Sequence, residues 1–385
     1  MHSEEELARK SAVGRYLAGE SASAICISLE RSREWFYKWL NRHKQGDEDW
    51  FKDRSRCPHH HPRKTSKDVE GMVLTARRDL DGQGLFCGAQ AILWELEDLG
   101  VEPLPSESTV NRVLRKHGLV QRRSGRYQSK GKKYPALSAK HPNDVHEYDF
   151  VGPCYITGGL RFYSLNALDI ATRRCGLEVK TSKKDIYRSI YEIWNRLGLP
   201  KYAQFDNAME FYGSPAHPRG MGQVIRLCLH HRVEPVFIPI REPWRNGAIE
   251  KFNDHWENKF YGRVTIADKE GLDLESLRFE NRHNSRWRYS PLGGKTPMQS
   301  LEASRRKMAF PAQLRSGSLA KPKSGQYHLV RFIRSDRLLD IFGEKFLMPA
   351  KVVYEYVQAT IDVGRETLTV RRDNERIKEL DYPSH

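Results

Sequence analysis

The sequence predicts a multidomain protein with an all-helical N-terminal part, a central α/β domain built on a mixed sheet, and a small, barrel-like β domain at the C-terminus. Three observations predict this order. Apolar residues recur at helical spacing through the first 120 residues, change to strand-like alternation from Val145, and form strand-like runs again beyond about residue 320. A length of 385 residues accommodates two to four domains of ordinary size.

The first fifty residues have the pattern of a helix-turn-helix unit. Two short helices separated by turns precede a third with a basic outer face, and in such units the last helix enters the major groove. The third helix is expected to begin at Ser32 and to carry Arg33, Lys38 and Arg42 on its outer face. We predict a DNA-binding domain over residues 1–50, with these three side chains on DNA.

A second unit of the same kind is predicted over residues 66–125. Helices are expected at Asp68–Leu80 and Ala89–Leu99, and Ser106 is expected to cap a third. A helical bundle with solvated faces is the plain alternative for either unit alone, but two in tandem favour DNA binding. Asn and Arg suit base edges, and Arg and Lys suit phosphates. The expected DNA contacts are Asn111, Arg112, Arg115, Lys116, Arg122 and Arg123.

The net charge of +16 is concentrated in two segments. Ten Lys and Arg and no acids lie between Asn111 and Lys140, a stretch that includes a predicted basic linker over residues 126–142. Thirteen lie between Arg278 and Arg334, against two acids. Charge alone would suit DNA, RNA or an anionic membrane surface. No stretch approaches the ~20 apolar residues that a bilayer span needs, which excludes an integral membrane protein.

Three acids in the central domain, residues 143–300, occupy positions where carboxylates can converge. Asp149 ends the first predicted strand, Asp206 directly follows the buried strand Lys201–Phe205, and Glu250 lies in the first turn of a later helix. Oxygen ligands of this kind suit Mg²⁺ or Mn²⁺. Two such ions ~4 Å apart would activate an attacking oxygen and stabilise the leaving one in phosphodiester displacement. For any one acid alone, a cap, a turn or an ion pair is the simpler interpretation.

The segments HEYDFVGP, QFDNAMEF and PWRNGAIEKFN resemble the catalytic core of retroviral integrases and bacterial insertion-sequence transposases, the DDE superfamily with an RNase H-like fold. The resemblance covers roughly residues 140–300. It implies an RNase H-like core with Asp149, Asp206 and Glu250 as the catalytic, metal-binding triad, and two Mg²⁺ or Mn²⁺ ions per site. Asp169 matches a recurrent acid of the family that is not a metal ligand. Glu147 and Asp144 lie close enough to compete for the first role.

The chain departs from the family pattern at three places. Ala208 stands where a glycine usually follows Asp-Asn, and the 43 residues between Asp206 and Glu250 are more than is typical, a surplus that fits a loop insertion over residues 213–222. Glu257 stands where the family often has a basic residue that touches DNA. Lys251 and Lys259 are expected to substitute for it, and Arg245 and Asn246 are further candidates for contact with DNA at the site.

The resemblance implies a transposase or integrase, a polynucleotidyl transferase that binds element ends and catalyses metal-dependent DNA cleavage and strand transfer. Its partners would be double-stranded DNA, both element ends and target, and further copies of the chain. Two alternatives stay open: a DNA-binding regulator with a degenerate core, and a nuclease of the same fold that cuts but never joins. The six cysteines form no CxxC pair and no signal peptide precedes them, so we expect a bacterial cytoplasmic, nucleoid-associated location.

Overall fold

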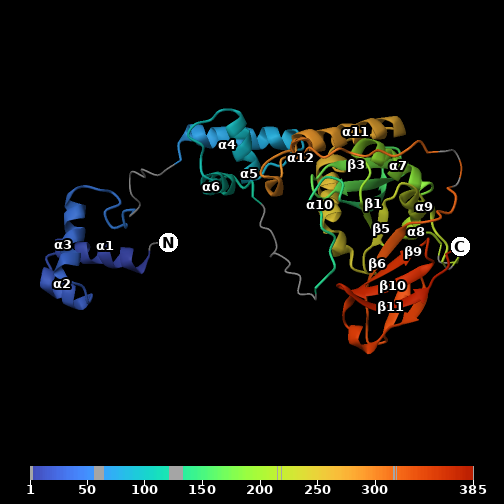
Figure 1. Cartoon of the computed structure of the whole chain (residues 1–385). Helices are drawn as coiled ribbons and strands as arrows, with labels where there is room; N and C mark the ends of the chain where they lie inside the picture. The colour runs from blue at the N-terminus through green and yellow to red at the C-terminus, as the bar shows by residue number, and fades with distance from the viewer. Residues whose placement is uncertain are drawn as a thin grey trace. The chain divides into compact units, whose positions relative to one another are not determined.

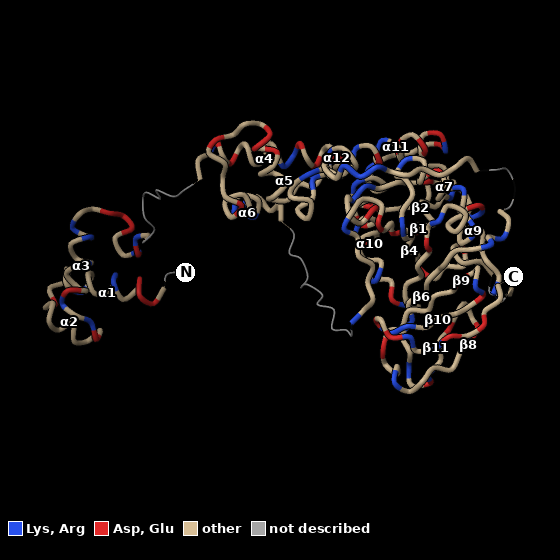
Figure 2. The backbone as a smooth tube through the Cα atoms, in the orientation of Figure 1, with Lys and Arg blue, Asp and Glu red and all other residues tan. Residues whose placement is uncertain are grey.

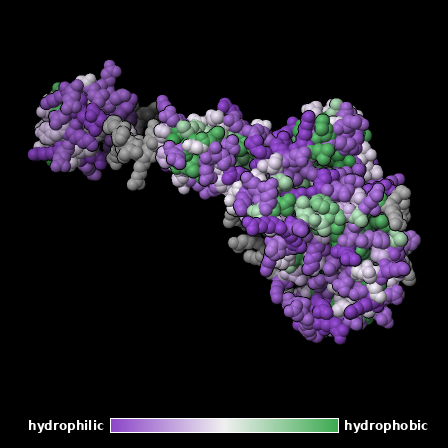
Figure 3. All heavy atoms as spheres, turned by 45° about the horizontal axis from the view of Figure 1, so that its top comes forward, coloured by the Kyte–Doolittle hydropathy of each residue, from purple (hydrophilic) through white to green (hydrophobic). Residues whose placement is uncertain are grey.

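The computed structural model describes residues 3–55, 65–120, 133–214, 216–217, 219–314, 317 and 319–384 (Figure 1). The chain divides into two compact units, Met1–Thr65 and Ser66–His385. Lys and Arg occur along the N-terminal helices as well as around the central sheet (Figure 2). Among the described residues, no helix is long and apolar enough to cross a membrane, and the face shown in Figure 3 is mostly hydrophilic with separate hydrophobic patches.

The first unit is a bundle of three short helices, as the sequence predicts. They are α1 (Glu4–Leu17), α2 (Ala22–Ser28) and α3 (Arg33–Lys44). Each begins at a serine whose hydroxyl accepts a backbone N–H three residues on, a contact that satisfies one of the free donors of a helix start. The helices enclose a small core of Ala12, Val13, Ile25, Cys26, Phe36, Trp39 and Leu40.

A second helical bundle opens the second unit. Its helices are α4 (Lys67–Gly82), α5 (Ala89–Asp98) and α6 (Glu107–Lys116). Ser66 and Ser106 cap α4 and α6. The buried residues of α6 are Val110, Val113 and Leu114, the spacing that an amphipathic helix requires. The helices predicted for this segment are therefore present.

The rest of the second unit is built on a nine-stranded sheet with the order β11-β10-β9-β6-β5-β4-β1-β2-β3. The first five strands are β1 (Val145–Tyr155), β2 (Arg161–Asp169), β3 (Cys175–Lys180), β4 (Tyr202–Phe205) and β5 (Glu234–Phe237). The later ones are β6 (Gln326–Phe332), β9 (Tyr356–Asp362), β10 (Thr367–Arg372) and β11 (Glu375–Asp381), and β7 (Leu338–Ile341) pairs with β8 (Glu344–Leu347) in a separate hairpin.

The central sheet is mixed and covered by helices on both faces, as predicted. β1, β2 and β3 are antiparallel, whereas β4 and β5 run parallel to β1. One face is covered by α7 (Ile186–Leu197) and α9 (Gln223–His230), and the other by α10 (Gly247–Trp256) and α11 (Lys269–Arg286) (Figure 1). The remaining helical elements are α8 (Met209–Tyr212), η1 (Pro243–Asn246), η2 (Glu257–Tyr261), η3 (Ser290–Leu292), α12 (Pro297–Ser304) and η4 (Ala350–Val352).

The C-terminal strands extend this central sheet, which differs from the separate barrel-like domain that the sequence predicts for residues 320–385. β6 runs parallel to β5 through the pairs Val236↔His328 and Phe237↔Leu329, and β9, β10 and β11 follow in antiparallel order. Their apolar side chains, such as Leu329, join the same core as α7 and α9. The unpaired edge of β5 therefore receives the C-terminal segment, because an open strand edge offers unsatisfied backbone groups.

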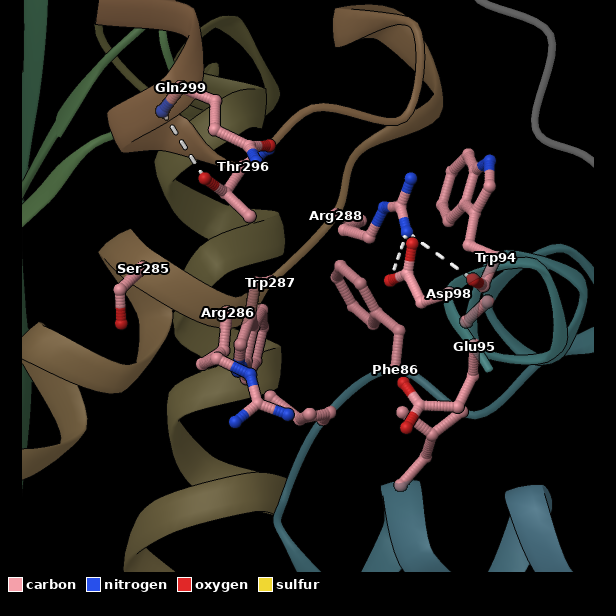
Figure 4. A pocket seen from close by; sticks show the side chains of 13 residues that line it. Phe86, Trp94, Glu95, Asp98, Ser285, Arg286, Trp287, Arg288, Thr296 and Gln299 are labelled. Carbon is pink, nitrogen blue, oxygen red and sulfur yellow. Dashed lines mark hydrogen bonds and ion pairs between the residues drawn. The ribbon is translucent and has the colours of Figure 1, made fainter. Parts of the chain in front are cut away.

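The α4–α6 bundle contacts the last turn of α10, the η2 segment and the C-terminal end of α11. The Asp81 carboxylate, at the end of α4, forms ion pairs with the Lys259 ammonium at 2.8 Å and with the Arg263 guanidinium at 2.9 Å. The Lys259 hydrogen bond, with Arg263 contributing, holds the pKa of Asp81 well below its usual range. On the other side of the junction, Arg288 pairs with Asp98 at 2.7 Å (Figure 4). The bundle and the sheet domain share one hydrophobic core.

Asp81→Ala is expected to loosen this junction. It leaves Lys259, whose side chain is only 15% exposed, without its carboxylate, at a cost of about 1 kcal/mol, which lowers the melting temperature by a few °C. Because the folded-state pKa of Asp81 is depressed, its stabilisation is present at neutral pH and is lost as the pH falls below about 4, where the two proteins should converge. Thermal unfolding of the full chain measures this difference. The control is Asp79→Ala on the same helix, whose carboxylate is 53% exposed and lies 3.8 Å from Arg78; an equal loss there would contradict the assignment.

Candidate active site

Strand pairing places Asp149 and Asp206 side by side. β1 and β4 are parallel, with Val145 opposite Tyr202 and Glu147 opposite Gln204, so the same register puts Asp149 level with Asp206. Neighbouring strands lie about 4.8 Å apart, and side chains alternate between the two faces. Glu147 and Gln204 hydrogen-bond to each other and to the start of α10. Two residues further on, Asp149 and Asp206 therefore share the α10 face of the sheet.

Glu250 reaches this face because α10 is anchored on β1. Helix α10 has no side-chain cap of its own, and Glu147 supplies one from the sheet: its Oε2 accepts the backbone N–H of Ile249 at 2.8 Å. Asn246, directly before the helix, donates to the Tyr148 carbonyl at 3.0 Å. These two contacts hold the first turn of α10, and with it Glu250, against β1.

A chain of polar side chains that sequence reasoning missed orients Asp149. Asn253 donates to Asp149 Oδ2 at 2.8 Å, accepts from Asn166 at 2.8 Å, and Asn166 in turn accepts from Ser164 at 2.6 Å. Asn166 lies opposite Asp149 on β2. The signal for Asn253 in the sequence is its position three residues after Glu250, on the same side of one helix.

The pKa of each of the three acids is raised, and that of Asp149 responds to the charges of the other two. Burial raises the pKa of Asp149 to about 6, with repulsion from Asp206 and Glu250 adding to the effect, while hydrogen bonds from the Phe150 N–H and from Asn253 oppose it. Burial also raises the pKa of Asp206 and of Glu250. A raised pKa caused by burial and nearby like charges is frequent among carboxylates that act on a substrate or hold a cation.

The acids are of the right chemical type for a divalent cation, but they are not gathered into a closed ligand shell. Carboxylate oxygens are the ligands that Mg²⁺ prefers, and a cation would relieve the repulsion that raises the Asp149 pKa. Within the described part of the chain, however, no group of three or more His, Cys, Asp or Glu side chains is arranged to hold a metal ion. One oxygen of Asp149 is taken by Asn253, and one of Asp206 by the Ala208 N–H at 3.0 Å. The three carboxylates are therefore chemically suitable ligands for Mg²⁺ or Mn²⁺.

Asp149→Asn is expected to stabilise the metal-free protein above pH 6. The carboxyl has a pKa of about 6 in the folded chain, against a usual value near 4. Its ionisation therefore destabilises the fold as the pH rises from about 4 to above 6, by at most about 3 kcal/mol. The amide removes that charge. Melting curves of both proteins in a chelator should coincide near pH 4 and separate above pH 6, with Mg²⁺ then stabilising only the wild type. Asp254→Asn, an exposed partner of Lys251 on the same helix, is the control and should bring no gain; equal melting of Asp149→Asn and wild type at every pH would contradict the prediction.

The loop after Asp206 is held from two sides. Ala208 has φ −70° and ψ 137°, values that any L-residue adopts, so this turn does not need the glycine that the resemblance leads one to expect. Asn207 donates to the Ile238 carbonyl at 2.6 Å and accepts from Arg331 at 2.8 Å. Burial raises the pKa of Asp206, and the positive charge of Lys183, which pairs with Glu210 at 3.0 Å, offsets part of that rise. Arg331 and Lys183 were both missed by sequence reasoning.

The acids that competed with the triad have other roles in the structure. Glu147 is the cap of α10, as described above. Asp144 pairs with Arg306 and accepts the backbone N–H groups of residues 140 and 141. Asp169 is fully buried and accepts the backbone N–H groups of Thr172, in the turn after β2, and of Asn143, before β1, so it ties these two segments together.

The predicted DNA contacts in the two helical bundles are placed on their surfaces. Arg33 and Lys38 are exposed on α3, and Arg42 is half-buried over the Trp39 ring. On α6, Arg112 and Arg115 are exposed and Asn111 is half-buried. Lys116 is exposed but pairs with Glu70 at 2.7 Å. Arg122 and Arg123 lie outside the described residues, and so do residues 126–132 of the predicted linker.

Near the carboxylates, the predicted DNA contacts divide into accessible and inaccessible ones. Lys251 is exposed, with Asp254 at 2.9 Å. Asn246 is only 3% exposed and braces α10, so it is not accessible to DNA in this structure. Lys259 is held by Asp81 at the junction with the α4–α6 bundle. Arg245 pairs with Glu242 and lies against the rings of Tyr134 and Tyr356.

No family model matches the chain. The chain is similar to two structures of the HTLV-2 integrase catalytic core domain in complex with magnesium, in dimeric and trimeric form, both at 16% identity with a TM-score of 0.33. They cover 43% and 42% of this chain and 99% and 98% of theirs. A third, the simian T-cell lymphotropic virus intasome in complex with PP2A regulatory subunit B56 gamma, is 12% identical with a TM-score of 0.37, over 80% of this chain and 96% of that one. TM-scores below 0.5 do not establish a common fold or function.

Proposed function

We propose that this protein is a transposase or integrase that binds DNA ends and catalyses metal-dependent DNA cleavage and strand transfer. What supports the proposal is that Asp149 and Asp206 hold matching positions on the neighbouring parallel strands β1 and β4, with Glu250 on the helix anchored to β1, and that the charges of Asp206 and Glu250 add to the burial that raises the pKa of Asp149. The basic charge and the two helical bundles support DNA as the substrate. The resemblance to integrases and transposases favours a multimer that pairs two ends, and the cysteine pattern favours a bacterial cytoplasmic location.

In this proposal, each residue has a defined part. Asp149, Asp206 and Glu250 hold Mg²⁺ or Mn²⁺, two ions per site, which when bound supply charge neutralisation for phosphoryl transfer. Asn253 fixes the orientation of Asp149, and Glu147 fixes the helix that carries Glu250. Asn207 fixes the loop that carries Asp206. Phosphoryl transfer asks the protein mainly for positioning and for stabilisation of charge, which is what rigid supports of this kind provide.

The reaction itself distinguishes this function from its alternatives. The full chain is incubated with Mg²⁺, labelled element ends and a target duplex, and the products are separated on a denaturing gel. Ends joined to target support the proposal. Cut ends without joining would indicate a nuclease, and a shifted band on a native gel without any new product would indicate a regulator.

One observation favours the regulator as a second candidate. In the described part of the chain the acids are not grouped for a metal, as a degenerate core would show. Mg²⁺ titration separates the two: a regulator would show no Mg²⁺-dependent rise in melting temperature, whereas the proposed enzyme would, and Asp149→Asn would remove that rise.

A further inference from the structure

A basic pocket lies at the opposite end of strand β4 from Asp206. The pocket, of about 290 Å³, is lined by residues directly before β1, before β4 and before β5, together with residues 306–309 after α12. Asp206, by contrast, follows the end of β4. The four residues of β4 rise about 13 Å, so the pocket and the acids are separated by less than one turn of B-DNA, which is about 34 Å.

The walls of this basic pocket are fixed by backbone contacts. The Leu199 N–H donates to the Ala309 carbonyl at 2.7 Å, which ties the segment after α12 to the loop before β4. Gly198 has φ +87°, and a Cβ there would lie 2.6 Å from the Asn143 side-chain nitrogen, so only glycine permits this close approach. Asn143 itself is buried and donates to the Leu197 carbonyl at 3.1 Å. The pocket is therefore preformed.

The basic pocket carries positive charge that the protein does not neutralise. Lys201, Arg232, Arg306 and Lys307 line it, and its lining residues include no Asp or Glu. Arg306 pairs with Asp144, but Lys201, Arg232 and Lys307 form no ion pair within the described part of the chain. Arg232 has φ +59°, a left-handed conformation that costs an arginine about 1 kcal/mol. It lies just after helix α9, where the Val233 N–H donates to the Cys228 carbonyl at 2.8 Å, and this helix end fixes its position in the pocket wall.

We propose that the basic pocket binds phosphates of duplex DNA at a position separate from the phosphate that reacts at the carboxylates. The pocket gives a role to Arg306 and Lys307, two residues of the basic stretch between Arg278 and Arg334 that lie outside the carboxylate site. Unpaired Lys and Arg around a preformed hollow suit a phosphate backbone, because each neutralised phosphate releases a condensed counterion. The inference rests on the proposed function in that duplex DNA is the partner.

The test is the salt dependence of DNA binding by the full chain in a chelator, which keeps catalysis out of the measurement. Fluorescence anisotropy with a labelled duplex gives the slope of log Kobs against log salt. Arg232→Ala/Lys307→Ala should weaken binding at every salt concentration and reduce the slope by about 2. Arg232→Lys/Lys307→Arg keeps both charges and should bind like the wild type. Lys345→Ala/Arg371→Ala, two exposed cations of β8 and β10 outside the pocket, should change the slope less.

An unchanged slope in the alanine variant, or an equal loss in the β8 and β10 control, would overturn the basic pocket as a DNA site. Inorganic phosphate at constant ionic strength probes the other source of the same group. If phosphate binds the wild type and not the alanine variant, while both proteins bind duplex equally and phosphate does not displace it, the pocket is a small-anion site and the proposal fails. None of these results depends on strand transfer, so they leave the proposed function to be judged by its own assay.

Discussion

Asp206→Asn is expected to abolish strand transfer while DNA binding persists. The amide keeps the size of the side chain and can still accept the Ala208 N–H, so the loop should stay folded. It removes the charge that Asp206 contributes beside Asp149, and with it a proposed ligand of the metal. Loss of a group that stabilises charge in the transition state costs at least about 10³-fold in rate, or about 4 kcal/mol. Joined product on a denaturing gel and a mobility shift measure the two properties separately.

The matched control for this variant is Asp254→Asn. It also removes one carboxylate from the last part of α10, but Asp254 is exposed and, among the described residues, its ion-pair partner is Lys251 at 2.9 Å. Strand transfer by this control should stay within about threefold of the wild type. If Asp206→Asn joins ends as well as the control does, Asp206 is not part of the active site and the triad is wrong.

Arg331→Met is expected to lower the rate of strand transfer by about 10- to 100-fold without weakening DNA binding. Arg331 is only 4% exposed. Its guanidinium donates to Asn207 Oδ1 at 2.8 Å, to the Ile238 carbonyl at 3.0 Å and to the Asp340 carbonyl at 2.9 Å. Asn207 adjoins Asp206. This arginine on β6 therefore positions the loop of a proposed metal ligand, and an error of 1 Å there is enough to lose two orders of magnitude.

Three measurements separate this positioning role from a general effect on folding. The maximal rate should fall while the DNA concentration for half-maximal rate stays constant. Asn207→Ala combined with Arg331→Met should cost little more than either change alone, because both act through one contact. Arg331→Lys should restore part of the rate, and Arg337→Met, which removes a guanidinium bonded to the Met348 carbonyl elsewhere in the C-terminal segment, should leave it unchanged. Additive losses, or a matching loss in Arg337→Met, would contradict the role.

Sequence reasoning predicts a separate C-terminal domain, whereas β6 and the strands that follow it belong to the central sheet. Strand periodicity identifies β6, β9 and β10, and the structure contains all three. It does not identify their partners, because the pairing of β6 with β5 joins residues about ninety positions apart. Helix α11 was also missed, although Leu272, Phe279 and His283 recur on its buried side at helical spacing.

What the sequence determined by itself is the set of local elements and the order of the acids along them. The apolar periodicity of β1 and β4, and the position of Asp206 at the end of a buried strand, follow from the chain as printed. The tertiary structure decided which side chains meet. Asn253 reaches Asp149 across 104 positions and Arg331 reaches Asn207 across 124, while Asn246 is buried and Lys259 is held by Asp81. Periodicity records only which face of an element is buried; the neighbour on that face depends on how the whole chain packs.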